Sequence, residues 1–336
     1  MATPARRIGL IGAGMVSQHH LQAWRAAQPR AKVVAIADPS HERAQQRAGA
    51  FDVEDTYANI DALLADAAVD AVDIAAPREV HAEAVIKAAQ RGVPVLCQKP
   101  LAPTFALAEA LVAQVAGKTR LMVHENWRFR PYYRQIAQWL AEGRVGRVVQ
   151  CSMTLFSSGV LPDSKGNRPA LVRQPFMQSL DRMLVSEVLI HHIDTLRFLL
   201  GPLELDSAHL GRSFKQMKGE DRATIALLTT DGGTVLLQAN LAVHGAPPAL
   251  IDQLRIIGED GTITLDGPDL NLAGARAEHR SYDLAACYQA SYDSTIAHFL
   301  DCLDSGAPFE TAPDDNLQTL RLVEAVYQHA SRSPED

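Results

Sequence analysis

The sequence lacks any apolar run long enough to cross a bilayer, and it lacks a long run of basic residues. A membrane-spanning helix needs about 20 consecutive apolar residues, and no stretch approaches that length. The formal net charge is −7, and an acidic chain does not attract nucleic acid or anionic lipid. These absences predict a protein with no membrane segment and no nucleic-acid partner.

Cysteine is also scarce. Disulfide frameworks are typical of small secreted domains, whereas the few cysteines here are scattered along 336 residues without the spacing of a metal site. We therefore expect buried free thiols and a location in the reducing cytoplasm. The cysteines are Cys97, Cys151, Cys287 and Cys302.

Strand and helix signals alternate over the first 125 residues of a chain long enough for two domains. Short apolar runs predict strands at 7–11, 32–37, 71–75, 93–97 and 120–123. Segments with helical spacing lie between them, at 15–27, 41–50, 60–65, 79–91 and 105–116. This alternation is typical of right-handed βαβ units and a parallel sheet. We expect the first domain to occupy residues 1–124.

The pattern changes after about residue 145. A long helix is predicted at 182–200, then strands at 223–229, 234–239, 253–258 and 262–265, and helices at 292–305 and 314–331. Asp231-Gly232 and Asp260-Gly261 lie where hairpin turns need positive φ. Successive strands favour an antiparallel sheet. Residues 125–336 should therefore form an α+β domain with a large, open, mostly antiparallel sheet that binds substrate and supports oligomerisation.

A glycine-rich turn follows the first predicted strand. Gly12-Ala13-Gly14-Met15-Val16-Ser17 has the dinucleotide-binding pattern, with Ser17 in the third glycine position. Gly12 allows a tight turn, and Gly14 lets the backbone approach a pyrophosphate at the helix N-terminus. The turn, including Met15 and Val16, predicts a cofactor site and a doubly wound Rossmann domain.

An acidic residue ends the second predicted strand. Asp38 can accept hydrogen bonds from the adenosine ribose and repel a 2′-phosphate, which favours NAD over NADP. A helix-capping role for Asp38 is the alternative. Nearby Arg43 keeps some use of NADP open.

A lysine follows the strand predicted at 93–97, in Gln98-Lys99-Pro100. Ala76-Pro77 and His81 follow the strand at 71–75. Ligands bind outside the carboxyl ends of parallel strands, so we assign Ala76, Pro77, His81, Gln98 and Lys99 to the cofactor site.

These motifs together resemble the glucose–fructose oxidoreductase and inositol dehydrogenase family, called Gfo/Idh/MocA. The family writes the lysine motif as Glu-Lys-Pro, and this chain departs from it at Gln98. The resemblance implies that Lys99 lies beside the nicotinamide and the reacting carbinol, where a lysine can relay a proton. Further matching segments are Asn126-x-Arg128-Phe129, His191-x-x-Asp194, Gly258-Glu259-Asp260-Gly261 and 320–325.

The helix predicted at 182–200 carries polar residues at i, i+4 and i+7, namely Glu187, His191 and Asp194, which share one face. The resemblance makes His191 the catalytic histidine, able to accept the substrate hydroxyl proton. Glu187 stands where the family usually has Asp, and we assign it to substrate binding. The neighbouring His192 is assigned to substrate binding, with a structural role as the alternative.

The segment 124–133 follows the fifth predicted strand. Glu125 stands where the family more often has an apolar residue, and with Asn126 and Arg128 it is assigned to substrate hydroxyls. Two alternatives stay open for Glu125: a salt bridge to Arg128 or Arg130, and a divalent cation shared with Glu187 or His191. The nearby aromatic residues can stack on a sugar or form core. They are Trp127, Tyr132 and Tyr133.

The expected reaction is hydride transfer to NAD from a carbinol of a sugar or polyol, including the anomeric carbon of an aldose, which would give a lactone. Lys99 and His191 would share the proton transfer, without a metal. Two alternatives remain: a non-catalytic NAD-binding regulator, and a hydrolase or epimerase that uses NAD transiently. We expect a homodimer or homotetramer, because the second domain has too few helices to cover both sheet faces.

Overall fold

The computed structural model describes residues 4–331, and the chain divides into two compact units. Unit 1 comprises Met1–Arg130 and Tyr288–Leu320, and unit 2 comprises Pro131–Cys287 and Arg321–Asp336. The sequence placed one boundary near residue 124 and missed the return of the chain to unit 1. The return has a clear cause: Tyr292, Ile296 and Phe299 join one hydrophobic core with Leu21 and Trp24.

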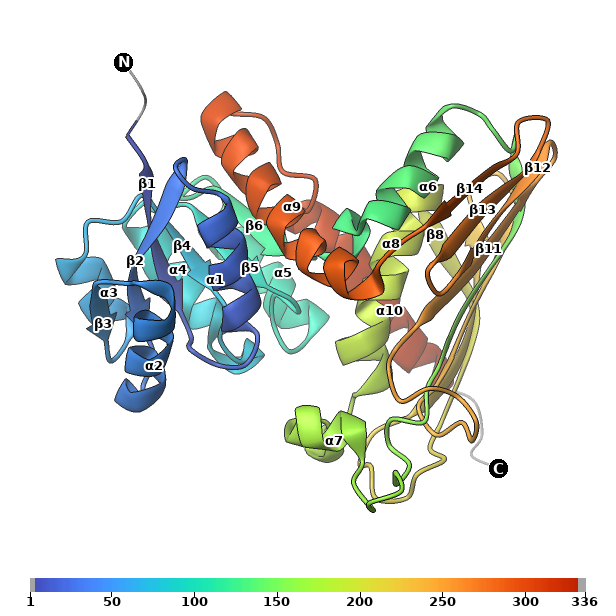
Figure 1. Ribbon diagram of the computed structural model, residues 1–336, viewed down its shortest axis with the longest axis horizontal. Helices are drawn as coiled ribbons and strands as arrows, with labels where there is room; N and C mark the ends of the chain where they lie inside the picture. The colour runs from blue at the N-terminus through green and yellow to red at the C-terminus, as the bar shows by residue number, and fades with distance from the viewer. Residues whose placement is uncertain (1–3, 332–336) are drawn as a thin grey trace. The chain divides into compact units, whose positions relative to one another are not determined.

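Unit 1 is built on a six-stranded parallel sheet with the strand order β3-β2-β1-β4-β5-β6 (Figure 1). The predicted doubly wound fold is therefore confirmed, although the short β3 was not predicted. Its strands are β1 (Arg6–Ile11), β2 (Ala31–Ala37), β3 (Asp55–Tyr57), β4 (Ala71–Ile74), β5 (Val95–Gln98) and β6 (Leu121–His124).

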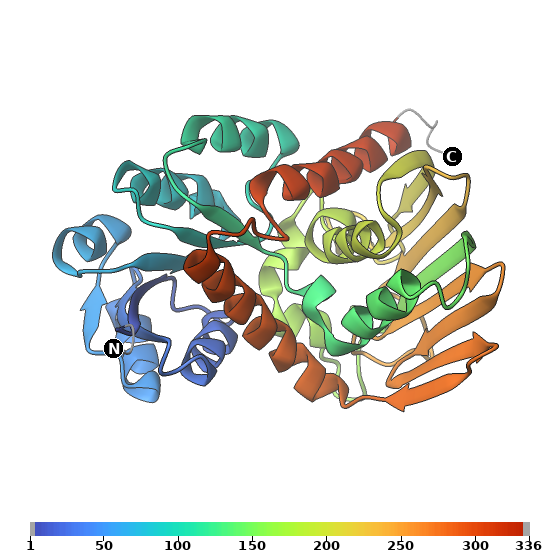
Figure 2. The same ribbon diagram turned by 90° about the horizontal axis from the view of Figure 1, so that it is seen from above.

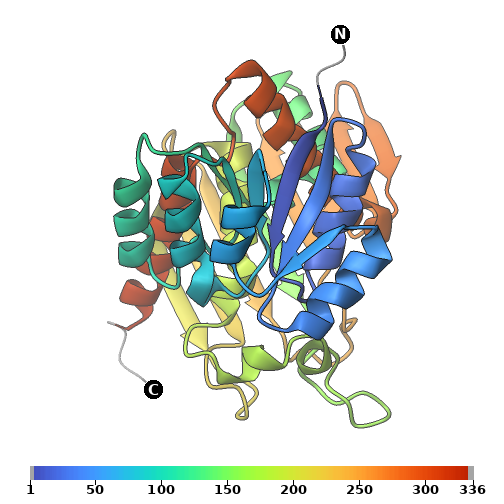
Figure 3. The ribbon, with the colours of Figure 1, turned by 90° about the vertical axis from the view of Figure 1, so that its left-hand side faces the viewer.

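Helices cover both faces of this sheet, with α1 and α2 on one side and α4 and α5 on the other (Figure 3). Ser40, Asn59 and Thr104 begin α2, α3 and α5, and each side chain accepts a backbone N–H of the first turn. These are preferred N-cap residues. The helices are α1 (Ser17–Ala26), α2 (His41–Phe51), α3 (Ile60–Asp66), α4 (His81–Gln90) and α5 (Phe105–Val115), with 3₁₀ turns η1 (Arg78–Val80) and η2 (Trp127–Phe129).

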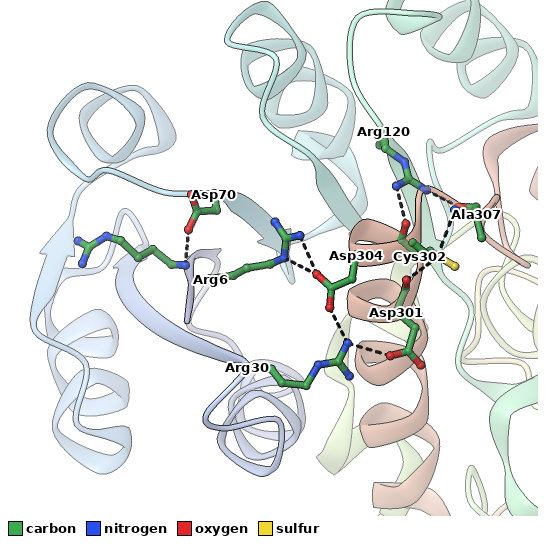
Figure 4. Close-up of polar contacts among 10 residues, drawn as sticks. Arg6, Arg30, Asp70, Arg120, Asp301, Cys302, Asp304 and Ala307 are labelled. Carbon is green, nitrogen blue, oxygen red and sulfur yellow. Dashed lines mark hydrogen bonds and ion pairs between the residues drawn. The ribbon is translucent and has the colours of Figure 1, made fainter. Parts of the chain in front are cut away.

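The end of helix α9 (Leu284–Ser305) is tied to the amino ends of three strands of unit 1 (Figure 4). Arg6 and Arg30 each donate to the carboxylate of Asp304, at 2.7 and 2.9 Å. Arg120 donates to the carbonyl oxygens of Cys302 and Ala307. Three arginines at strand starts therefore hold the returning segment on this unit.

Unit 2 contains an eight-stranded sheet with the order β14-β13-β12-β11-β7-β10-β9-β8. Only β7 and β10 pair in parallel, so the predicted mostly antiparallel sheet is confirmed. Sequence reasoning missed β7, β8, β13 and β14. The strands are β7 (Val148–Phe156), β8 (Leu203–Gly211), β9 (Arg222–Thr229), β10 (Thr234–Asn240), β11 (Asp252–Gly258), β12 (Gly261–Asp266), β13 (Asp269–Gly274) and β14 (Glu278–Ser281).

The two predicted hairpin glycines behave differently. Gly232 has φ +86°, as expected for its turn. The second turn also joins an antiparallel hairpin, β11 to β12, but the expected positive φ is wrong for Gly261. A Cβ on Gly261 would lie 2.7 Å from the Ala273 carbonyl oxygen, so the close approach of β13 favours glycine there.

The helices of unit 2 gather on one face of its sheet (Figure 2). Alternate residues of β9 and β10 are buried on that face, among them Ile225 and Leu237. No described helix covers the other face, where Phe156, Leu228 and Leu236 remain 37–39% exposed. The helical elements are α6 (Pro131–Ala141), α7 (Pro169–Arg173), η3 (Pro175–Ser179), the π-helix η4 (Leu184–Leu189), α8 (Ile190–Leu200) and the second part of α10 (Pro313–Ala330).

Within residues 4–331, no helix combines the length and the apolar character of a membrane span.

Candidate active site

The glycine turn after β1 has the geometry that a bound dinucleotide needs. Gly12 has φ +102°, and a Cβ there would lie 2.6 Å from the Ala75 carbonyl oxygen at the end of β4. No atom lies within 4 Å of a Cβ built on Gly14, so the backbone is open there. The Ser17 hydroxyl donates to the Gly14 carbonyl at 2.6 Å. A small buried residue at position 17 thus replaces the third glycine, and the turn fits a pyrophosphate.

Asp38 braces this turn from the end of β2. Its carboxylate accepts the backbone N–H groups of Ala13 and Ser40, both at 2.8 Å, and the Arg43 guanidinium at 3.0 Å. Burial raises the pKa of Asp38, but these three donors outweigh it and hold the pKa below its usual value. Among residues 4–331, Oδ2 accepts only the Ala13 N–H, which leaves this carboxylate capacity for a ribose hydroxyl.

His81 links the ends of β4 and β5. Its ring nitrogens lie 2.8 Å from the Ala76 carbonyl oxygen and 2.9 Å from the Pro100 carbonyl oxygen. Burial lowers the pKa of His81, against the opposing effect of the two carbonyls. His81 thus lies between the loops that carry Ala76, Pro77 and Lys99 and helps to fix them, and its direct contact with the cofactor stays a prediction.

The side chain of Gln98 also makes contacts inside unit 1. Its side chain is buried, and Oε1 accepts the Lys99 backbone N–H at 2.9 Å. Its amide nitrogen faces His20 and His124 in the interior of unit 1. Gln98 therefore supports the lysine turn, and its direct contact with the cofactor stays a prediction. Lys99 itself lies at the carboxyl end of β5, half-buried, where the sequence placed it.

Asn126 and Arg128 make hydrogen bonds inside unit 1. The Asn126 amide donates to the Ser291 hydroxyl at 2.7 Å, and the Arg128 guanidinium donates to the Asp315 carboxylate at 2.7 Å. Both side chains are buried. These polar groups hold the segment after β6 on the returning chain, and their assignment to substrate stays a prediction.

Glu125 is completely buried, and its carboxylate accepts the Trp127 backbone N–H at 3.3 Å. Trp127 in turn packs under the Arg130 guanidinium, 3.3 Å from the ring centre. Trp127 belongs to unit 1, and Tyr132 and Tyr133 are buried in unit 2. The burial of these rings agrees with core packing, the alternative to sugar stacking.

The predicted helix at 182–200 is not a continuous α-helix. Residues 184–189 form a π-helical turn, and α8 begins only at Ile190. Glu187 therefore lies on the π turn and His191 in the first turn of α8. Such turns often occur at functional sites. Residues 190–196 are all buried, which also contradicts the expected division into a polar and an apolar face.

Glu220 holds the start of this π turn. Its carboxylate accepts the backbone N–H of Val185 at 3.0 Å and that of Met183 at 3.4 Å. The Tyr327 hydroxyl donates to Glu220 at 2.6 Å, and burial raises the pKa of Tyr327. These buried donors and acceptor fix the turn that carries Glu187.

His192 supports α8. Its Nδ1 lies 3.1 Å from the Val188 carbonyl oxygen, and its Nε2 lies 2.9 Å from Asp252 on β11. The Tyr133 hydroxyl donates to the same carboxylate at 2.8 Å. His192 has no exposed surface, and these contacts agree with the structural alternative that the sequence left open for it. The neighbouring His191, the predicted catalytic residue, lies in the same helix and keeps 9% of its surface exposed.

Sequence reasoning overlooked four buried polar residues that brace these segments. Two of them had a signal: Asp73 is a charge inside the apolar run 71–75, and Asp252 comes directly before the strand predicted at 253–258. The other two are His20 and Glu220. In the described part of the chain, no three His, Cys, Asp or Glu side chains form a group that could hold a metal ion.

Comparison with known proteins agrees with this architecture. Residues 6–126 match the model of an oxidoreductase family with an NAD-binding Rossmann fold, and residues 133–264 match the GFO/IDH/MocA C-terminal domain. D-Apiose dehydrogenase of Paraburkholderia graminis is 33% identical over 96% of this chain and 86% of its own length. D-Apiose dehydrogenase of Rhizobium rhizogenes is 31% identical over 96% of this chain and 94% of its own length.

A similar solved structure is that of an oxidoreductase from Agrobacterium radiobacter in complex with NAD+, L-tartaric acid and magnesium. It is 30% identical to this chain, with a TM-score of 0.90, and the match covers 97% of this chain and 96% of that one. The similarity thus extends over both units.

Proposed function

Because the chain belongs to the Gfo/Idh/MocA family of oxidoreductases, we propose that it oxidises a sugar or polyol at a carbinol carbon, with NAD as the cofactor. The preferred substrate in this proposal is D-apiose, the sugar in the names of two relatives that match 96% of the chain. Its anomeric carbon would be oxidised, which gives a lactone.

One observation carries the proposal: the open glycine turn and Lys99 occupy the same carboxyl edge of the unit 1 sheet. Gly12, Gly14, Met15, Val16 and Asp38 would hold the dinucleotide. Asp38 is ionised at neutral pH, since its pKa lies below the usual value, and an anion there disfavours a 2′-phosphate. NAD, when bound, supplies the acceptor for the hydride.

The chain's own residues manage the proton. In this proposal His191 accepts the proton of the substrate hydroxyl, and Lys99 relays it. Glu187, on the π turn, binds substrate hydroxyls, and Glu125 is retained as a second hydroxyl ligand. Ala76 and Pro77 border the cofactor edge, where His81 fixes their loop.

We also infer a homodimer or homotetramer that buries the open face of the unit 2 sheet, where Phe156, Leu228 and Leu236 are exposed. The buried free thiols fit the reducing cytoplasm as its location.

The test is an NAD-coupled screen of aldoses, polyols and inositols, read by the appearance of NADH. D-Apiose should give the highest kcat/KM, with a lactone as the first product. Turnover of another sugar or polyol alone would keep the reaction class and reject the apiose assignment.

Two outcomes would reject the dehydrogenase itself. Tight NAD binding without turnover of any substrate in the panel would favour a regulator. Substrate conversion with retained cofactor and no net NADH would favour a hydrolase or epimerase.

A further inference from the structure

A cluster of polar side chains lies in the interior of unit 1, behind the turn that carries Lys99. Its members come from four elements: His20 from α1, Asp73 from β4, Gln98 from β5 and His124 from β6. All four are buried, and the rings of His20 and His124 lie 4.3 Å apart between centroids. Polar groups at such depth destabilise a fold unless they hydrogen-bond, so their partners define which proton each one carries.

The orientation of the Gln98 amide follows from the backbone beside it. The Lys99 N–H can only donate, so Oε1 of Gln98 faces it, at 2.9 Å. The amide nitrogen then lies 3.1 Å from Nε2 of His20 and 3.4 Å from Nδ1 of His124. Because the amide nitrogen carries two N–H donors, both ring nitrogens must accept. Neither histidine therefore carries a proton on the ring nitrogen that faces Gln98.

Asp73 determines where His20 keeps its proton. Since Nε2 of His20 accepts from Gln98, the ring proton is on Nδ1, which lies 2.8 Å from Oδ2 of Asp73. Trp24 donates its indole N–H to the same oxygen at 2.7 Å. The other oxygen of Asp73 has no hydrogen-bond partner among residues 4–331. A carboxylate in this position favours the Nδ1–H tautomer and orients the ring.

We propose that Asp73, His20 and Gln98 are positioning residues that hold the backbone of Lys99 through one directed chain of hydrogen bonds. Asp73 sets the His20 tautomer, His20 sets the orientation of the Gln98 amide, and the amide oxygen holds the Lys99 N–H. If the amide turned over, its NH₂ group would oppose the Lys99 N–H donor. The inference rests on the proposed role of Lys99, through which all three residues act.

This chain of hydrogen bonds explains why glutamine is suited to position 98. A carboxylate has no N–H donor, so a glutamate there would need a proton on each ring nitrogen that faces it. With Gln98 the ring nitrogens that face the amide can accept its N–H groups, and Asp73 lies on the far side of His20. Asp73 and Gln98 therefore function as a matched pair.

The test is a double-mutant cycle with Gln98→Met and Lys99→Met. Gln98→Met keeps the length of the side chain and removes the acceptor for the Lys99 N–H. We expect it to lower kcat about 10- to 100-fold, with KM and the Kd of NAD within about twofold, since a misplaced group loses rate more than binding. In the Lys99→Met background the same change should have almost no further effect on kcat.

A matched control is Gln135→Met, the same change at a buried glutamine of α6 in unit 2. It should leave kcat unchanged. Wild-type kcat in Gln98→Met, or an equal loss with and without Lys99, would overturn the proposal. If Lys99→Met alone keeps near-normal kcat, the proposed function fails as well. If Lys99→Met lowers kcat strongly while Gln98→Met keeps wild-type kcat, the chain of positioning residues alone is rejected.

A second measurement needs no variant and no turnover. Nitrogen-15 NMR of the histidine rings in the intact wild-type protein should show His20 as the Nδ1–H tautomer and His124 as the Nε2–H tautomer. A protonated His20, or its Nε2–H tautomer, would overturn the proposed chain even if Gln98→Met does not fold.

Discussion

Individual side chains near the cofactor edge of unit 1 divide into two groups. His81, Gln98, Asn126 and Arg128 are buried and make hydrogen bonds within the unit, which fix the loops around them. Lys99 follows β5 at the edge itself. Sequence motifs mark both groups equally, because a residue that shapes a loop and one that contacts a ligand can share a motif. Substitution separates the two roles.

The first prediction concerns the proton-transferring residues. Lys99→Met keeps side-chain length and loses the ammonium, and His191→Asn keeps a polar group and loses the base. Each should lower kcat about 10²–10⁴-fold, with NAD binding retained by calorimetry. The double variant should lose less than the product of the two factors. Near-normal kcat in Lys99→Met on the true substrate would show that the catalytic centre is misplaced.

The second prediction concerns cofactor choice. NAD should exceed NADP at least tenfold in kcat/KM, about 1.4 kcal/mol, because ionised Asp38 repels a 2′-phosphate. Arg43, whose guanidinium lies 3.0 Å from Asp38, is the control. Arg43→Ala should reduce the use of NADP further. Equal efficiency with both cofactors would reject the role assigned to Asp38.

The third prediction tests the link between three elements of unit 2. Asp252 on β11 joins Tyr133 of α6 to His192 of α8. Asp252→Ala would remove the acceptor that these two buried side chains share, and should lower the free energy of unfolding by about 3–5 kcal/mol. Tyr133→Phe removes one bond and should cost about 1–3 kcal/mol. Urea unfolding measures both. A loss in Asp252→Ala no larger than that in Tyr133→Phe would contradict this account.

The fourth prediction concerns the end of α9. Hydrogen bonds from Arg30 and Arg6 lower the pKa of Asp304 in the folded state. Stability from a lowered pKa is complete above the unfolded-state pKa and is lost as pH falls through the folded-state pKa. Asp304→Asn should therefore destabilise at neutral pH, by less than about 1 kcal/mol because Asp304 is 48% exposed.

This difference between wild type and Asp304→Asn should shrink as pH falls below about 4, and it should also shrink in high salt. Urea unfolding at several pH values would check it. A difference that grows toward acid pH would mean that the two arginines do not stabilise the Asp304 carboxylate.

At the level of elements, sequence pattern predicted what depends on local periodicity. The apolar runs of β1, β2 and β4 and the capped helices between them were found, because their buried faces repeat within one segment. The π turn before α8 was not, since Glu220 and Tyr327 stabilise it from distant parts of the chain. Likewise His20 and Asp73 meet only after β1 and β4 pair.

For the whole molecule, the uncovered sheet face leads to the fifth prediction. Phe156, Leu228 and Leu236 form an exposed apolar set on strands β7, β9 and β10. Light scattering at micromolar concentration should show a dimer or tetramer. Leu228→Asp with Leu236→Lys should shift it toward the monomer, because charges are poorly tolerated in a dry interface. Val172→Asp, at a more exposed apolar residue of α7, is the control and should leave the assembly unchanged.

The return of residues 288–320 to unit 1 has a consequence for synthesis on the ribosome. The core around Leu21 and Trp24 is closed by Tyr292, Ile296 and Phe299, which are translated after nearly all of unit 2. Ribosomes add about 5–20 residues per second, so the nascent cofactor unit stays incomplete for roughly ten to forty seconds. During that interval the apolar side chains around Leu21 and Trp24 stay uncovered, and a fragment that ends at Arg130 should keep them uncovered permanently.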